Sequence, residues 1–84
     1  MPRLRVLLFS TAREAVGQSE LEVPYRRGQT LAEVLAEVVA AHPRLRPYLR
    51  HRLALDGEFL EQPASAVILS SQKEVAILPP FSGG

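Results

Sequence analysis

The sequence predicts an α+β domain in which one long helix covers one face of a mixed β-sheet. Three observations lead to this expectation. Residues 30–42 have the spacing of an amphipathic helix, two strongly apolar segments lie near the two ends of the chain, and Asp56-Gly57 separates two short apolar runs. An amphipathic helix must bury its apolar side against another element, and strands supply that surface.

The amino-terminal elements follow from apolar runs and turn residues. Residues 4–9 are apolar and rich in β-formers, which predicts a first strand that is mostly buried. Ser10 and Thr11 are expected to cap a short helix that ends at Gly17. Residues 20–23 alternate between polar and apolar types, which is typical of a half-exposed strand.

The long helix carries the clearest signals in the chain. Thr30 and Glu33 have the spacing of a capping box, in which each side chain bonds the other's backbone N–H. Pro43 is expected to end the helix. The apolar positions recur at helical spacing; they are Leu31, Val34, Leu35, Val38 and Val39.

The second half predicts a hairpin and a central strand. Residues 45–50 fit another turn of helix, and the runs 52–55 and 58–60 flank the Asp-Gly turn. Residues 66–69 fit either a short strand or a packed loop. Residues 74–78 form an apolar last strand, which we expect to lie beside the first strand in the middle of the sheet.

Composition bounds the class of protein. The 84 residues, 46% of them hydrophobic, fit a single domain, and the net charge of +1 is too small to favour nucleic acid or a membrane surface. Cysteine is absent, so the sequence encodes no disulfide and no thiolate metal site. No segment resembles a signal peptide or a membrane span, and the expected location is the cytoplasm.

The chain ends in Gly83-Gly84, and this pair predicts a reactive terminus. Without a Cβ, the last residues can pass through a narrow slot in another protein's active site. Residues 79–82, Pro-Pro-Phe-Ser, separate the pair from the last strand. We therefore expect a folded domain over residues 1–80 and a flexible tail over residues 81–84. A frayed terminus without a function is the alternative.

Three segments resemble one known family. The residues 9–14, Phe-Ser-Thr-Ala-Arg-Glu, the residues 56–59, Asp-Gly-Glu-Phe, and the residues 74–84 from Glu74 to the Gly-Gly end resemble the small, sulfur-carrying subunit of molybdopterin synthase. The resemblance spans essentially the whole chain and implies a ubiquitin-like β-grasp fold. The sequence departs from the family at Asp56, where Asn is common, and at residues 72–74, where Gly-Asp-Glu is common.

The resemblance implies a carrier role rather than an enzyme. In the family, an ATP-dependent enzyme adenylates the terminal glycine and a sulfur donor protein converts it into a thiocarboxylate. The large synthase subunit then takes the tail into its active site, where two sulfur transfers convert a cyclic pyranopterin into the molybdopterin dithiolene. Gly84 is thus the expected reactive residue, with Gly83 keeping the channel open. The chain is expected to bind no cofactor and to form a heterotetramer with the large subunit.

Some residues are expected to contact these partners. By the resemblance they include Leu78, Phe9, Phe59 and Arg13. Phe81 is expected to anchor a partner because it is an aromatic residue beside a reactive end, and folding back on the sheet is the alternative for it. Pro79, Pro80 and Ser82 belong to the same expected contact segment. An ordinary core position is a comparable interpretation for Phe9, Phe59 and Leu78, because alternation along a strand does not say which face is covered. A solvated helix face is an equal alternative for Arg13 and its neighbour Glu14.

No other pattern predicts catalysis. His42 and His51 have no second ligand or acid–base partner at a useful spacing, and no metal site is expected. Four arginines between residues 44 and 52 form a basic cluster, which fits a solvated face or, less well, contact with phosphate or an acidic partner. The competing functions are a sulfur carrier for tRNA thiolation or thiazole synthesis, a ubiquitin-like protein modifier, and a plain interaction module.

Overall fold

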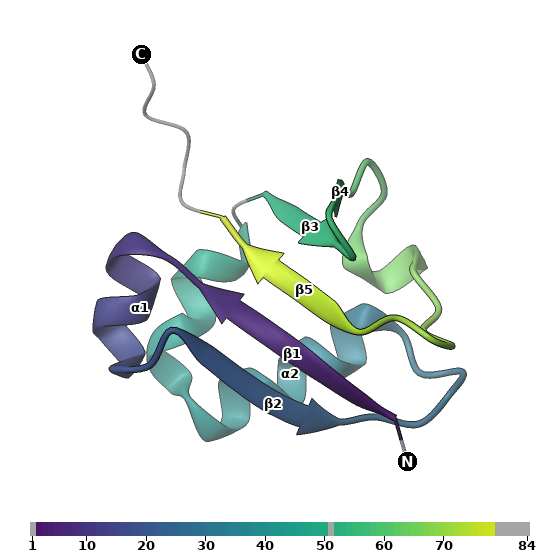
Figure 1. Cartoon of the computed structure of the whole chain (residues 1–84), viewed down its shortest axis with the longest axis horizontal. Coiled ribbons are helices and arrows are strands. Elements are labelled where there is room, and N and C mark those ends of the chain that lie inside the picture. Colours follow the sequence, from purple (N-terminus) through teal and green to yellow (C-terminus); the bar gives the residue numbers. More distant parts are fainter. Residues whose placement is uncertain (1, 51, 79–84) are drawn as a thin grey trace.

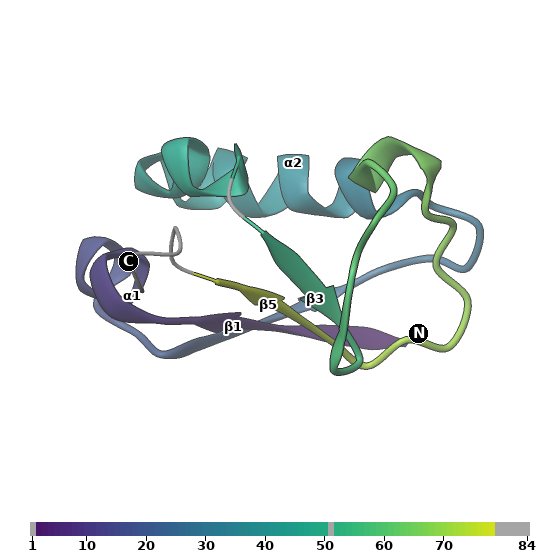
Figure 2. The ribbon, with the colours of Figure 1, turned by 90° about the horizontal axis from the view of Figure 1, so that it is seen from above.

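A mixed five-stranded sheet with the strand order β2-β1-β5-β3-β4 forms one layer of the molecule, and the helices cover one of its faces (Figures 1 and 2). The computed structural model describes residues 2–50 and 52–78. The elements are β1 (Arg3–Leu8), α1 (Ser10–Val16), β2 (Glu20–Pro24), α2 (Leu31–Ala41), the 3₁₀ helix η1 (Pro43–Arg50), β3 (Leu53–Leu55), β4 (Glu58–Phe59), the 3₁₀ turn η2 (Ala64–Ala66) and β5 (Glu74–Ile77). The predicted α+β class with a mixed sheet is confirmed.

The first and last strands pair in parallel at the centre of the sheet. Their register runs from Arg5 opposite Glu74 to Leu8 opposite Ile77. The strand β2 pairs antiparallel with β1 on one side, and β3 pairs antiparallel with β5 on the other. The predicted central position of both apolar strands is confirmed. Because they run in the same direction, β1 and β5 end at the same edge of the sheet.

The core lies between the sheet and α2. Both bonds of the predicted capping box are present, since Thr30 Oγ1 accepts from Glu33 N at 3.1 Å and Glu33 Oε1 accepts from Thr30 N at 2.9 Å. The five apolar helix positions named above are all buried. They belong to one cluster with the inner residues of the central strands, which are Leu4, Val6, Leu8, Val75 and Ile77. The helix ends at Ala41, just before Pro43, as predicted.

The start of α1 differs from the expectation. The N-cap is Phe9, which makes no side-chain capping bond, and Ser10 has a left-handed φ of 54°. The extended conformation of β1 continues through Phe9, so the sharp turn into the helix falls on Ser10 and its hydroxyl cannot act as a cap. The predicted Ser10-Thr11 cap is therefore wrong. Gly17 ends the helix with a φ of 83°, as predicted.

The structure shows the conformation of two segments that the sequence alone did not decide. Residues 64–66 form the turn η2, and a single bridge joins Ile68 to Thr30, so residues 66–69 form a packed loop rather than a strand. The expected turn over residues 45–50 is part of η1, which begins at Pro43 and buries Leu45.

The hairpin turn is tied to the loop before β5. Asp56 and Gly57 have φ values of 48° and 86°, and two successive left-handed residues are typical of a type I′ turn. The Asp56 carboxylate accepts hydrogen bonds from Lys73 N at 2.9 Å and Glu74 N at 3.0 Å. The Asp56 side chain therefore holds the backbone of residues 73 and 74 in place. These residues belong to the segment 72–74, in which the sequence departs from the pattern common in the family that it resembles.

The buried Tyr25 holds the same loop through a hydrogen bond. Its hydroxyl donates to the carbonyl oxygen of Gln72 at 2.8 Å. Burial raises the pKa of the phenol above 10.0; the Arg27 charge lowers it, and the Asp56 charge raises it. The neutral phenol is thus the form that the fold stabilises.

Replacing Asp56 tests this tie. Asp56→Ala removes the acceptor for two backbone N–H groups and places a Cβ-bearing residue without a local hydrogen bond at a left-handed position, so we expect a loss of about 2–4 kcal/mol of unfolding free energy. Asp56→Asn keeps an acceptor oxygen and tolerates the conformation, and should cost about 1 kcal/mol. Urea unfolding measures both, and equal losses for the two variants would contradict the assigned role.

Tyr25 predicts a loss of stability at alkaline pH. Since the folded-state pKa is raised, the stabilisation is fully present below the unfolded value of 10.0 and is lost as pH rises past it. Tyr25→Phe should cost about 1 kcal/mol at neutral pH through the lost hydrogen bond, and should flatten the alkaline decline. Urea midpoints at neutral pH and just above the phenol's unfolded pKa measure both effects. An unchanged alkaline decline in the variant would rule out this tyrosine as its source.

Candidate functional site

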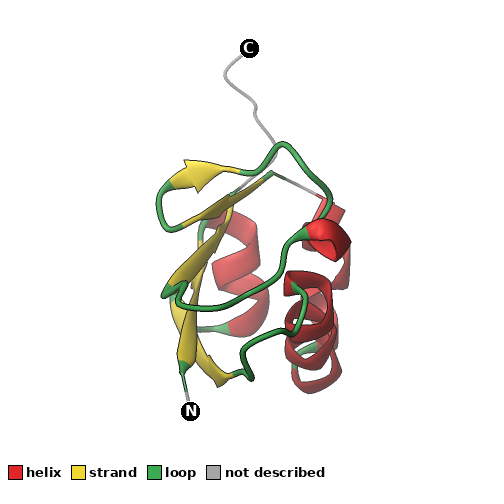
Figure 3. Ribbon diagram, turned by 90° about the vertical axis from the view of Figure 1, so that its right-hand side faces the viewer, coloured by secondary structure: helices red, strands yellow, loops and turns green. Residues whose placement is uncertain are grey.

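One face of the sheet is open. All the helices that the structure describes lie on the other side or at the sheet's end, so the outer side chains of the strands face away from α2 (Figure 3). Along β1, the inner positions Leu4, Val6 and Leu8 belong to the core, whereas the alternate positions Arg3, Arg5 and Leu7 point outward. This open face is the candidate functional site.

An apolar row crosses the open face. The strand register places Leu7 opposite Ala76, Ala76 opposite Ala54, and Ala54 opposite Phe59. Directly paired residues point to the same side of a sheet, so these four side chains form one line across four strands. Phe59 keeps 56% of its surface exposed at the end of the line.

A second row lies next to the first, at the edge where β1 and β5 end. Phe9 and Leu78 directly follow Leu8 and Ile77, the last pair of the parallel register, and Leu78 N donates to Arg52 O at 3.0 Å. Phe9 is 40% exposed and Leu78 is half-buried. The guanidinium carbon of Arg52 lies 4.2 Å from the centre of the Phe59 ring, which joins the two rows. We call the two rows together the apolar half of the open face.

The other half of this face is charged and internally neutralised. Arg3 pairs with Glu22 at 2.8 Å, and Arg5 pairs with Glu74 at 2.8 Å and with Glu20 at 3.9 Å. Exposed pairs of this kind contribute about 0–1 kcal/mol each, so their role in stability is small. They do keep the charged half of the face solvated, which leaves the apolar half as the part that gains most from being covered.

The predicted partner residues fall into two groups. Phe9, Phe59 and Leu78 come together on the apolar half, and the exposure of the two phenylalanines excludes the core interpretation for them. The other expected residues of the site lie outside the described residues: they are Pro79, Pro80, Phe81, Ser82, Gly83 and Gly84. The chain enters that segment directly after Leu78, at the edge that carries the second row.

Arg13 lies on α1, exposed and close in sequence to Phe9. It makes no ion pair with any residue that the structure describes. Contact with a partner and a solvated helix face therefore both stay open for Arg13 and Glu14.

Sequence reasoning missed part of this surface. Leu7, Ala54 and Ala76 were not singled out, because each lies next to apolar residues in the sequence and no polar alternation marks it. In the structure Leu7 and Ala54 are half-buried, and Ala76 is buried between its neighbours on the sheet. Ile68 was missed as well and is 57% exposed. It lies away from the apolar half, beside the start of α2, where it bridges Thr30.

The described part of the chain offers little acid–base chemistry. No charged side chain is buried in residues 2–50 and 52–78. No group of three or more His, Asp or Glu side chains in these ranges could hold a metal ion. His42 serves as the C-cap residue of α2, and His51 lies outside the described residues. The helices within the described ranges are all too short or too polar to cross a bilayer.

Comparisons with known proteins agree with this architecture. The ThiS family matches residues 6–84 of the chain. A molybdopterin synthase sulfur carrier subunit of Chlamydomonas reinhardtii is 35% identical over 98% of the chain and 99% of that protein. A protein of the same name from Arabidopsis thaliana is 37% identical over 96% of the chain and 82% of that protein.

Solved structures share the fold. The small archaeal modifier protein 1 of Methanosarcina acetivorans superimposes with a TM-score of 0.75 at 25% identity, covering 100% of this chain and 98% of that one. A complex of subunits 1 and 2 of the molybdopterin-converting factor from Helicobacter pylori contains a chain with a TM-score of 0.67 at 17% identity, covering 98% and 99%. The ubiquitin-like β-grasp fold implied by the resemblance is thus confirmed.

Proposed function

The chain belongs to the ThiS family, and from this premise we propose that it is the sulfur carrier subunit of a molybdopterin synthase. One observation in the structure supports the proposal in addition to family membership. The apolar half of the open face lies at the edge where β5 ends, so the last six residues of the chain begin beside the surface best suited to a partner. Docking and delivery of the terminal glycine can then occur together.

The partner on the apolar half is proposed to be the large synthase subunit. Phe59 and Phe9 supply exposed aromatic surface, and aromatic side chains are the usual anchors of protein interfaces. The Helicobacter pylori complex of subunits 1 and 2, which contains a chain of this fold, supports a second subunit as the partner. Arg52 holds the Phe59 ring in place before binding, which reduces the side-chain entropy lost on docking.

The chemistry is proposed to take place at Gly84. The terminal carboxylate attacks the α-phosphorus of ATP on an activating enzyme, and pyrophosphate leaves. The outer sulfur of a persulfide on a donor protein then attacks the acyl carbon and AMP leaves, which gives an acyl disulfide between the chain and the donor. A second thiol of the donor attacks this disulfide, forms a disulfide within the donor and releases the terminus as a thiocarboxylate. The sulfur reaches the pyranopterin precursor inside the large subunit, so the complex is the sulfurtransferase and this chain is its carrier.

The length of the segment after β5 suits this delivery. Six residues beyond Leu78 span at most about 20 Å when fully extended. A terminal glycine on such a tether can enter a partner's active site while the sheet stays docked on the partner's surface. Tethering of this kind raises the effective concentration of the reactive group, which is how positioning accelerates a transfer.

A protein modifier is the second candidate function. The similarity to the small archaeal modifier protein 1 at 25% identity over the whole chain favours it. In that case the activated Gly84 would acylate an amine of a target protein. The two functions differ in product, since one forms a thiocarboxylate and the other an amide.

Deleting Gly84 tests the carrier role. Reconstituted with the activating enzyme, a sulfur donor and the large subunit, the full chain should gain the mass of one oxygen-to-sulfur exchange and convert the precursor. The chain that ends at Gly83 should lose conversion by about 10²-fold or more, because misplacing the reacting atom has effects of that size. Undiminished conversion would end the proposal, and Gly84-dependent covalent ladders on a denaturing gel would favour the modifier.

Phe59→Asp tests the docking surface, and Ile68→Asp is its matched control. The two side chains are almost equally exposed, at 56% and 57%, but Ile68 lies away from the apolar half. Phe59→Asp should weaken binding of the large subunit by about 2 kcal/mol or more, and Ile68→Asp by less than about 0.5 kcal/mol. Calorimetric titration measures both affinities. Equal affinities for the two variants would remove the apolar half as the interface.

A further inference from the structure

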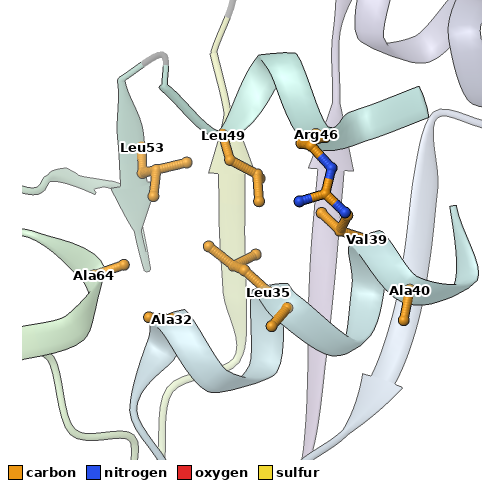
Figure 4. Close-up of a pocket in the computed structure, with 9 residues that line it drawn as sticks. Ala32, Leu35, Val39, Ala40, Arg46, Leu49, Leu53 and Ala64 are labelled. Carbon is orange, nitrogen blue, oxygen red and sulfur yellow. The ribbon is translucent and has the colours of Figure 1, made fainter. Parts of the chain in front are cut away.

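A second apolar surface lies on the helical side of the molecule. A hollow of about 400 Å³ lies between α2, η1, β3 and η2 (Figure 4). A neighbouring hollow of about 300 Å³ shares Leu49, Leu53 and Ala64 with the first, so the two form one elongated groove. We call this surface the helix-side groove.

Side-chain size explains why the groove stays open. The side of α2 that faces η1 carries alanines at positions 32, 36 and 40, which leave room above the helix. Leu35 and Val39 of α2 and Leu53 of β3 form the floor of the groove and are buried in the core. Leu49 of η1 forms one wall and is only half-buried. The groove is thus apolar at the bottom and built on packed elements.

The charged side chains that line the groove in the described part of the chain are all positive. Arg46 extends from η1 over Val39, and Arg52 borders the second hollow. No acidic residue lines either hollow among the residues that the structure describes. Arg46 is exposed and makes no ion pair within the described ranges, and the same holds for Arg44 and Arg50 of η1.

The carboxylates of α2 lie elsewhere. Glu37 lines a different hollow, between α2 and β2, together with Glu20 and Glu22. Glu33 is occupied by the capping box with Thr30. Acidic side chains therefore lie away from a groove that Arg46 and Arg52 border, and this arrangement favours an acidic occupant.

We propose that the helix-side groove binds a short acidic amphipathic segment of a partner protein. Its aliphatic side chains would fill the two hollows, and its carboxylates would meet Arg46 at the rim. Arginine is suited to this role because its guanidinium binds a carboxylate through two parallel hydrogen bonds. A single-stranded nucleic acid fits less well, because no aromatic side chain lines either hollow in the described ranges to stack with a base.

The groove and the open face lie on opposite sides of the sheet (Figure 2). A segment bound in the groove therefore leaves the apolar half free for the large subunit proposed above. The groove would hold the carrier on a second protein while the first surface is engaged, and the inference does not depend on which reaction Gly84 performs.

The test uses the full chain and a designed probe. The probe is a fluorescein-labelled peptide of about twelve residues with leucines at helical i, i+4 and i+7 spacing and glutamates between them, long enough for about three turns. Two control peptides are used: in one, lysine replaces every glutamate of the probe, and in the other, serine replaces every leucine. Arg46→Glu is compared with Arg26→Glu, which makes the same charge change at an exposed site on the turn before α2.

We expect the acidic peptide to shift amide resonances of α2, η1 and η2 and not those of Leu7 or Ala76. Arg46→Glu should weaken its binding by about tenfold or more, and Arg26→Glu by less than about twofold. Equal effects of the two variants, equal binding of the lysine or serine peptide, shifts that map to the open face, or no binding at all would each overturn the proposal. Thermal unfolding of both variants checks that the fold is retained.

Discussion

The parallel pairing of β1 with β5 is the constraint on which the rest of the structure depends. Two strands from opposite ends of the sequence lie side by side at the centre of the sheet, and both are apolar enough to be buried there. Because they run in the same direction, Phe9 and Leu78 reach the same edge. The last residues of the chain therefore begin next to the exposed aromatic side chains rather than at the far end of the molecule. An antiparallel pairing of the same strands would separate the terminus from that surface.

The open face is a consequence of the domain's size. With α2 of eleven residues, α1 of seven and short 3₁₀ segments, the described part of the chain has enough helical surface to cover only one side of the five strands. Arginine–glutamate pairs neutralise half of the other side, and the second half carries small apolar residues flanked by Phe9 and Phe59. Small alanines at the centre and aromatic rings at the borders make a shallow surface with raised edges, which a partner can cover without displacing the core.

Local signals predicted most of the fold. The capping box at Thr30 and Glu33, the Asp56-Gly57 hairpin and the two apolar central strands each carry their structural cause in adjacent residues, and all were confirmed. Ser10 was misjudged because the extended strand before it, and not its own side chain, sets its conformation. The exposure of Phe9 and Phe59 could not be predicted, since alternation is the same whichever face is covered. The helix-side groove was equally hidden, because it depends on how η1 and η2 pack against α2. The predicted terminal site, from Pro79 to Gly84, and the division into a domain of residues 1–80 and a tail of residues 81–84 stay predictions.

The position of β5 between two neighbours also has a mechanical consequence. If a partner draws the chain end into a channel, as proposed above, the chain following β5 transmits the pull to this strand. Its hydrogen bonds to β1 and β3 run roughly across the strand axis, so the load is shared by many bonds in shear and they do not open one after another. Had the last strand been at the border of the sheet, with a neighbour on one side only, the same traction could peel it away. The domain is built to be held by its end without coming apart.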